Sequence, residues 1–327
     1  MSKTTHWGII APGGIAQQFA IGLTAVEGAS LYSVAGRSID KAQAFAEKHN
    51  AEKYYDDYQA FLADDKLDAI YIATPHPFHK EFAMMCLEAG KAVLCEKPIA
   101  MNESELSEMI ECAKQNNVFF MEAVWTRFLP ATVKIRQLLA DKVIGEITRL
   151  TADFAFNASK EIRRLYEPEL GGGALLDVGI YPVNYATMIL GNTPKQILST
   201  AYLGETGVDE RASIILDYGN GVMANLYCGI TTFAKNEAVI YGEKGVITVH
   251  DFWQSQKLRI SYFDEREDEV IELPHAQNGY CYEAQEVMSL LAENKKESEI
   301  MSLEDSMAVM QIMDKLRADW GLKYPME

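Results

Sequence analysis

Three side chains of this chain, those of Lys97, Asp177 and Tyr181, could together transfer a proton. Lys97 follows the apolar run Ala92–Cys95 and Glu96, so we expect it at the exit of a buried strand, where ligands bind in parallel sheets. Asp177 and Tyr181 are four residues apart and would share one face of a helix. A nearby ammonium group stabilises phenolate and lowers a pKa that is ordinarily about 10, so this set could accept an alcohol proton. The plainer alternatives are a solvated loop lysine and a core tyrosine.

A glycine-containing turn, Ala11–Ala16, joins the predicted strand Trp7–Ile10 to an amphipathic helix. This order suits a dinucleotide pyrophosphate, because glycine lets the backbone approach it and a helix N-terminus attracts anions. The expected binding residues are Ala11, Gly13, Gly14 and Ile15. Ala11 stands where the usual pattern has its first glycine, so we expect an ordinary backbone angle there. A plain tight turn is the alternative.

The second predicted strand, Leu31–Ala35, ends at Gly36, Arg37 and Ser38 without an acidic residue at its tip. In NAD-binding folds an acid at this place usually holds the ribose hydroxyls. A guanidinium and a hydroxyl instead suit a 2′-phosphate, and Lys41 could add positive potential. We therefore expect NADP, with NAD as the other possibility and a solvated arginine as the alternative.

The elements that must position these side chains fall into two groups. Strands and helices alternate up to residue 123, which predicts a parallel, doubly wound sheet of the Rossmann type. After Trp125 strands dominate, several joined by tight glycine turns, which predicts an α+β domain with a large open, mainly antiparallel sheet. We expect a dinucleotide-binding domain at 1–123, followed by a domain for substrate binding and oligomerisation at 124–327.

Composition excludes several classes of function. The 327 residues carry a net charge of −17, and neither domain is basic, so nucleic acid and anionic membranes are poor partners. We expect no membrane span and no signal peptide. The five scattered cysteines are odd in number and lack metal-ligand spacing, so we expect a reduced, cytoplasmic protein without a metal.

Four stretches in this order carry a family resemblance: the strand–glycine turn–helix, Glu96–Pro98, Met121–Phe128 and Gly171–Tyr181. Over nearly its whole length the chain resembles the glucose–fructose oxidoreductase / inositol dehydrogenase / MocA (Gfo/Idh/MocA) family. Val93–Pro98 and Glu205–Asp209 are most similar to its dimeric dihydrodiol dehydrogenase and NADP-dependent D-xylose 1-dehydrogenase branch.

The resemblance implies roles for individual residues. It places Lys97 and Tyr181 at the nicotinamide as catalytic residues, with Asp177 at the family's acidic position. The residues that it adds to the cofactor site are Thr74, His76, His79, Glu96 and Lys97. Histidine at 76 replaces the family's asparagine, and His79 could simply cap or hydrogen-bond the helix that it opens. An aromatic-tolerant substrate pocket could contain Trp125, Arg127, Phe154 and Trp253.

We expect an enzyme that transfers a hydride between NAD(P) and a sugar or related alcohol, with Tyr181 taking the hydroxyl proton. Two alternatives stay open: an oxidoreductase of trans-dihydrodiols or dicarbonyls, and a non-catalytic regulatory protein that binds a dinucleotide. We also expect a homodimer or a higher homo-oligomer, joined through the open face of the second sheet.

Overall fold

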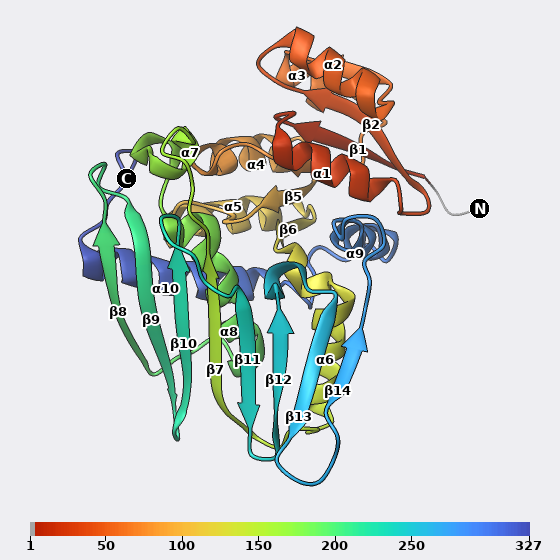
Figure 1. Cartoon of the computed structure of the whole chain (residues 1–327). Coiled ribbons are helices and arrows are strands. Elements are labelled where there is room, and N and C mark those ends of the chain that lie inside the picture. The colour runs from red at the N-terminus through yellow and green to blue at the C-terminus, as the bar shows by residue number, and fades with distance from the viewer. Residues whose placement is uncertain (1–3) are drawn as a thin grey trace. The chain divides into compact units, whose positions relative to one another are not determined.

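The computed structural model describes residues 4–327, which form two compact units (Figure 1). The first unit contains the residues up to Trp125 together with Ala276–Ser306. The second contains Thr126–His275 and Met307–Glu327. The expected division assigned all of 124–327 to the second domain, whereas the structure groups Ala276–Ser306 with the first unit. Each unit is described below by itself.

The first unit has a six-stranded parallel sheet in the order β3-β2-β1-β4-β5-β6, as expected for a doubly wound fold. The strands are β1 (Thr5–Ile10), β2 (Ala29–Ala35), β3 (Lys53–Tyr55), β4 (Ala69–Ile72), β5 (Ala92–Glu96) and β6 (Phe120–Ala123). The helices are α1 (Gly14–Leu23), α2 (Ile39–His49), α3 (Tyr58–Leu62), α4 (His79–Glu88), α5 (Glu103–Asn116) and α9 (Cys281–Ala292). Strands β4, β5 and β6 are buried throughout, which explains their unbroken apolar runs.

Side-chain caps determine where several helices of this unit begin. Asn102 accepts a hydrogen bond from the Glu105 backbone N–H at 2.9 Å and so caps α5, as its sequence predicts. Glu105 reaches back to the Met101 N–H at 3.0 Å. The first bond satisfies a backbone donor that the first helical turn would leave without a partner, and the second ties Glu105 to the residue before the cap.

The second unit has an eight-stranded sheet in the order β14-β13-β12-β11-β7-β10-β9-β8. Its strands are β7 (Ile147–Ala155), β8 (Gln196–Leu203), β9 (Asp209–Gly219), β10 (Val222–Gly229), β11 (Glu237–Gly242), β12 (Gly245–His250), β13 (Lys257–Tyr262) and β14 (Glu269–Glu272). Neighbours pair antiparallel except β7 and β10, which pair parallel, so the expected mainly antiparallel sheet is confirmed. The helices are α6 (Pro130–Ala140), α7 (Arg163–Tyr166), α8 (Ile180–Leu190) and α10 (Leu303–Trp320), whose first turn lies in the first unit.

Helices cover one face of this second sheet, and α8 and α10 lie behind the strands in Figure 1. Burial alternates along β11 and β12, as it must when one face packs on a core and the other does not. The row Leu198, Ile215, Asn225, Thr151 and Val239 crosses five strands in register, and each of its members is at least partly exposed. The sheet therefore keeps one open, partly apolar face.

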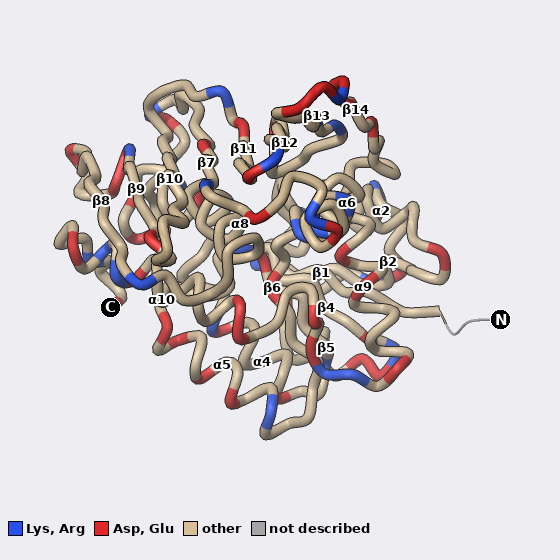
Figure 2. The backbone as a smooth tube through the Cα atoms, turned by 90° about the horizontal axis from the view of Figure 1, so that it is seen from below, with Lys and Arg blue, Asp and Glu red and all other residues tan. Residues whose placement is uncertain are grey.

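One helical stretch, Pro168–Leu190, is long and apolar enough to cross a membrane by length and composition alone. Of its apolar window, 83% is buried inside the protein, which is typical of a core helix. Acidic residues recur along α5 and on the loop between β13 and β14 (Figure 2), and those of the loop are exposed.

Candidate active site

Lys97 follows the last residue of β5, in the first unit, and is half-buried. Its backbone N–H donates to Glu96 Oε2 at 3.2 Å, and the Lys97–Pro98 peptide bond is cis. Glu96 is buried and accepts a hydrogen bond from the hydroxyl of Tyr71 on the neighbouring strand β4. The exit of β5 therefore presents a lysine beside a buried, hydrogen-bonded carboxylate.

His79 ties the exits of β4 and β5 together. Its side chain is fully buried, with Nδ1 at 2.8 Å from the carbonyl oxygen of Pro98 and Nε2 at 2.9 Å from that of Thr74. The ring makes no cap for α4, and its two nitrogens lie against these carbonyl oxygens instead. Burial lowers the pKa of His79 to about 4, and His76 lies with its ring 5.8 Å from the His79 ring. His79 thus fixes the turn that carries Lys97.

The glycine turn before α1 differs from our expectation at one residue. Ala11 has a φ of +67°, in the left-handed region that glycine adopts at little cost, so the expected ordinary angle is wrong. Its N–H bonds to the Ala35 carbonyl at 2.9 Å, which holds the alanine in the glycine conformation. Among residues 4–327, a Cβ added to Gly14 would meet nothing within 4 Å, and one added to Gly13 would meet only the Ala11 oxygen at 3.9 Å.

This open space lies at the N-terminus of α1, whose ten residues begin without a side-chain cap or an acidic residue in the described first turn. Ile15 is half-buried in the same turn. A helix start of this kind, with room for another group to approach its backbone, fits a dinucleotide pyrophosphate.

The residues after β2 leave a positive, accessible edge. Ser38 caps α2 by accepting from the Lys41 N–H at 3.4 Å, and the side chains of Arg37 and Lys41 are exposed. A guanidinium and a hydroxyl at this strand end fit a phosphate.

The second unit carries Asp177 and Tyr181 on one continuous helical stretch. Asp177 lies in a π-helical turn, Leu175–Gly179, and Tyr181 is the second residue of α8. Both residues are buried, and Asp177 Oδ1 accepts from Arg164 Nη1 at 2.6 Å. π-helical turns inside α-helices are frequent at functional sites.

An aromatic ring lies next to Tyr181 and stacks on a second one. The Phe154 ring from β7 lies 5.4 Å from the Tyr181 ring, and it stacks on Trp253 at 4.1 Å with an interplanar angle of 18°. Trp253 is half-buried, so part of its ring remains accessible. The structure thus brings three of the predicted residues together.

Two other predicted pocket residues have structural partners. Trp125, in the first unit, stacks on Tyr280 with ring centroids 4.4 Å apart. Arg127 is buried and donates from Nε to Asn184 Oδ1 at 2.7 Å, so it braces α8, the helix of Tyr181.

Sequence reasoning missed several buried acids, among them Glu283 and Asp209. Burial, and then the nearby negative charge of Glu96, raises the pKa of Glu283 well above its usual value. Burial raises the pKa of Asp209 to about 7. No sequence pattern indicated that Glu283 would be buried, because an acid in the first turn of a helix usually faces solvent. Asp209 belonged only to a stretch used for the family resemblance.

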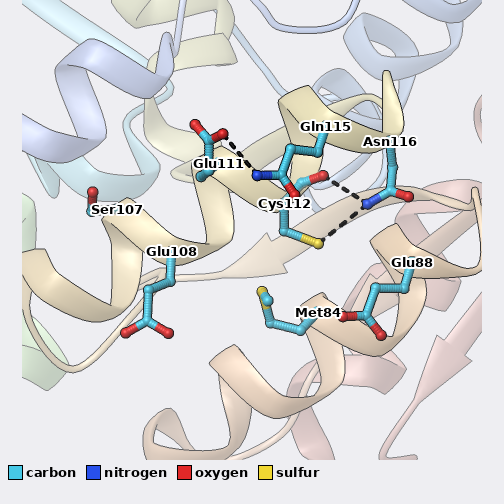
Figure 3. Close-up of a pocket in the computed structure, with 8 residues that line it drawn as sticks. All are labelled: Met84, Glu88, Ser107, Glu108, Glu111, Cys112, Gln115 and Asn116. Atoms are coloured by element: carbon cyan, nitrogen blue, oxygen red, sulfur yellow. Dashed lines mark hydrogen bonds between the residues drawn. The ribbon is translucent and has the colours of Figure 1, made fainter.

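One surface groove lies apart from these residues. It runs between α4 and α5 and is lined by Met84, Glu88, Ser107, Glu108, Glu111, Cys112, Gln115 and Asn116 (Figure 3). Its carboxylates face solvent, and it contains none of the predicted site residues. In residues 4–327 no group of three or more His, Cys, Asp or Glu side chains is arranged to hold a metal ion.

Two family models match the chain. The first, described as an oxidoreductase family with an NAD-binding Rossmann fold, matches residues 5–124. The second, the GFO/IDH/MocA C-terminal domain, matches residues 132–248.

Several full-length relatives share one name. Trans-1,2-dihydrobenzene-1,2-diol dehydrogenase of Xenopus laevis is 39% identical over 329 residues, which cover 98% of this chain and 99% of the relative. The Homo sapiens enzyme of the same name is 34% identical over 331 residues, covering 98% of each chain.

Solved structures agree on the fold. A 3-ketoreductase from Actinomadura kijaniata, in complex with NADP and TDP-benzene, is 25% identical with a TM-score of 0.87, covering 97% of this chain and 98% of that chain. Aldose-aldose oxidoreductase from Caulobacter crescentus is 20% identical with a TM-score of 0.89, covering 97% of each chain, and supports the fold alone. The family resemblance, the oxidoreductase class and a nicotinamide dinucleotide cofactor are thereby confirmed, and the non-catalytic alternative is left without support.

Proposed function

This chain belongs to the Gfo/Idh/MocA oxidoreductase family, and we propose that it oxidises one hydroxyl of a cyclic vicinal diol with NADP as hydride acceptor. The observation that carries this proposal is the arrangement around Tyr181. A buried phenol lies one helical turn from the Asp177 carboxylate and next to Phe154, whose ring stacks on Trp253. This arrangement suits a substrate with an alcohol to deprotonate and a ring face to stack.

We assign the proton transfer to Tyr181. Its phenol would accept the proton of the reacting hydroxyl, and Asp177, held by Arg164 at 2.6 Å, would orient the substrate or the phenol from the same helical stretch. NADP supplies the hydride acceptor when bound, and its pyrophosphate would lie at Gly13–Ile15, with its 2′-phosphate at Arg37 and Ser38. In the reducing direction the same phenol would donate the proton.

We propose that Lys97 acts with Tyr181 by favouring the phenolate. The family resemblance supports this pairing, and so does the spacing of the two residues. The A. kijaniata 3-ketoreductase has been solved as variants of a lysine and of a tyrosine 84 positions apart, the same separation as Lys97 and Tyr181 here.

The choice of substrate class depends on the aromatic pair and on the relatives. Both a trans-dihydrodiol and a pyranose offer a ring with neighbouring hydroxyls. The name shared by the relatives at 34–39% identity favours the first, and the stacked rings of Phe154 and Trp253 accept an unsaturated ring readily.

Turnover of the whole protein tests this function. NADPH formation would be followed with trans-1,2-dihydrobenzene-1,2-diol, trans-cyclohexane-1,2-diol and D-xylose as substrates. We expect Tyr181→Phe and Lys97→Ala each to lower kcat by about two or more orders of magnitude, as the loss of a general acid–base group does. Near-normal turnover by Tyr181→Phe would refute the assignment. Turnover of D-xylose alone would reject the dihydrodiol preference and keep the mechanism.

Tyr185 offers a matched control on the same helix. It is buried one turn after Tyr181, and its hydroxyl has no hydrogen-bond partner among the described residues. Tyr185→Phe therefore removes a phenolic oxygen from α8 without removing the proposed proton acceptor, and it should leave kcat within about twofold of the wild-type value.

We further propose that residues 1–123 bind the cofactor and that 124–327 bind the substrate and join the subunits of a homodimer in the cytoplasm. The open face of the eight-stranded sheet supports the dimer. Its exposed large apolar residues include Leu198, Tyr202 and Met223, and a two-fold pair is the commonest closed assembly.

A further inference from the structure

The carboxylate of Asp209 lies directly under the glycine turn that leads into the helical stretch of Asp177 and Tyr181. Asp209 is the first residue of β9 and is 0% exposed. Its Oδ2 accepts from the Leu175 backbone N–H at 2.7 Å. Leu175 begins the π-helical turn, so the bond satisfies a backbone donor at the start of the helical stretch. A carboxylate from a distant strand thus acts as the N-terminal cap.

Gly173 shows how closely the backbone approaches this carboxylate. A Cβ added at Gly173 would lie 3.3 Å from Asp209 Cγ and would overlap Oδ1. Oδ1 is buried without a hydrogen-bond partner among the described residues, so the carboxylate is held by packing as well as by the Leu175 bond. The turn and the carboxylate therefore have little freedom to shift independently.

Other contacts hold the opposite side of the turn. The Tyr324 hydroxyl donates to the Gly172 carbonyl at 2.6 Å, and the Gly173 N–H donates to the Leu165 carbonyl at 2.9 Å. The glycine turn and the Asp209 carboxylate together determine where the following helical stretch begins. They therefore also determine where Asp177 and Tyr181 lie.

We propose that Asp209 is a positioning residue of the reaction, which holds the Leu175–Leu190 helical stretch so that Asp177 and Tyr181 meet the substrate. This inference rests on the function proposed above for those two residues. Asp209 itself touches neither the substrate nor the cofactor in this account, and it acts through the backbone of Leu175.

The cap should depend on pH, because a carboxylate accepts a backbone hydrogen bond more strongly than a neutral acid does. Burial raises the pKa of Asp209 to about 7. The groups that face it are Arg317 of α10, whose charge favours the carboxylate, and Cys228 of β10 and Tyr324, whose own pKa values are raised by burial and then by the Asp209 charge. The cap should therefore strengthen as the pH rises through about 7.

Asp209→Asn tests the proposal, because asparagine has nearly the same shape and cannot ionise. We would measure kcat, KM and NADP affinity of the full chain between pH 5.5 and 9. The ratio of wild-type to variant kcat should grow with pH through about 7 and reach about tenfold, the scale on which a hydrogen bond to a charged acceptor exceeds one to a neutral acceptor, with NADP affinity unchanged. Glu210→Gln is the matched control, since Glu210 is the next residue, is also buried and pairs instead with Lys160. It should change none of these values.

Hydrogen exchange of the peptide 170–185 separates this inference from the proposed function. Asp209→Asn should speed exchange there, whereas Tyr181→Phe should not. Should Asp209→Asn fold poorly, the wild type suffices. An opening that exposes Asp209 returns its pKa from about 7 to the ordinary 3.8, so protection of this peptide, corrected for intrinsic exchange, should fall as the pH rises toward 7 and level off above it. Normal turnover by Tyr181→Phe refutes the proposed function. The role of Asp209 as a cap is then tested by hydrogen exchange of the peptide alone. A pH-independent kcat ratio, or unchanged exchange, refutes the positioning role even if Tyr181→Phe is inactive.

Discussion

Gly173→Ala is the sharpest perturbation that the structure offers. Gly173 has a φ of +118°, and an added Cβ would overlap the buried Asp209 carboxylate. The backbone strain should cost about 1–2 kcal/mol, and the overlap with fixed atoms about 1–3 kcal/mol more. We therefore expect the free energy of unfolding of the second unit to fall by about 2–5 kcal/mol.

Gly191→Ala is the matched control, because it isolates the strain. Gly191 has a φ of +99°, and an added Cβ would meet nothing within 4 Å. Alanine there should cost about 1–2 kcal/mol, the strain alone. The difference between the two variants therefore measures the overlap with Asp209.

Urea unfolding provides the assay, since Trp253 and Trp320 report on the second unit by fluorescence. In a double-mutant cycle, Asp209→Ala should recover part of the cost of Gly173→Ala, because it removes the atoms that the new methyl group meets. Equal costs for Gly173→Ala and Gly191→Ala, or strict additivity with Asp209→Ala, would show that the turn does not pack on this carboxylate.

Four further predictions concern other parts of the chain. Arg37→Asp should weaken NADP binding by about 1.5–3 kcal/mol, the scale of a hydrogen bond to a charged group, and spare NAD binding; an equal loss for both in calorimetry would contradict the 2′-phosphate role. Leu198→Glu should turn a dimer into a monomer of 36.6 kDa by light scattering, whereas a wild-type monomer would refute pairing through the sheet. Ala11→Gly should raise the free energy of unfolding by about 1 kcal/mol by relieving the strain at a φ of +67°, and a loss of stability would oppose this. Because His79 has a pKa of about 4 in the folded state and 6.5 ordinarily, its contribution of about 3 kcal/mol should be present above pH 6.5 and lost as the pH falls toward 4; an unchanged pH dependence in His79→Gln would disprove this.

Much of the fold could be predicted from local patterns. The alternating strands and helices before residue 123 form the predicted parallel sheet, and the strand-rich remainder forms the predicted mainly antiparallel sheet. Strand Lys53–Tyr55 and helix Tyr58–Leu62 were not predicted, since three and five residues are too few to show a period. The parallel pairing of β7 with β10 depends on contacts between distant segments, and the sequence carries no local signal for it.

Within the candidate site, only residues whose side-chain chemistry itself suggests a role could be predicted from the sequence. Tyr181 and Phe154 were chosen as chemical and aromatic groups, and the structure puts their rings 5.4 Å apart. Asp209 escaped notice because an acid at a strand start usually faces water. Its burial results from the way the glycine turn packs on β9, which no local pattern describes.

The chain has two glycine-rich stretches, Gly13–Gly14 and Gly171–Gly173, which look alike in the sequence. They differ in whether other parts of the protein fill the space beside the glycines. Around Gly172 and Gly173 the space that side chains would fill is occupied by the protein: a Cβ on Gly172 would lie 2.9 Å from the Leu165 carbonyl carbon and oxygen. That stretch uses glycine to let the chain pack on itself. A Cβ added at Gly14 would meet nothing within 4 Å among the described residues, so glycine there makes room for no packing partner of this chain. Glycine is costly in a helix, and its use at the open N-terminus of α1 is therefore best explained by a ligand that must approach the backbone, as a pyrophosphate does.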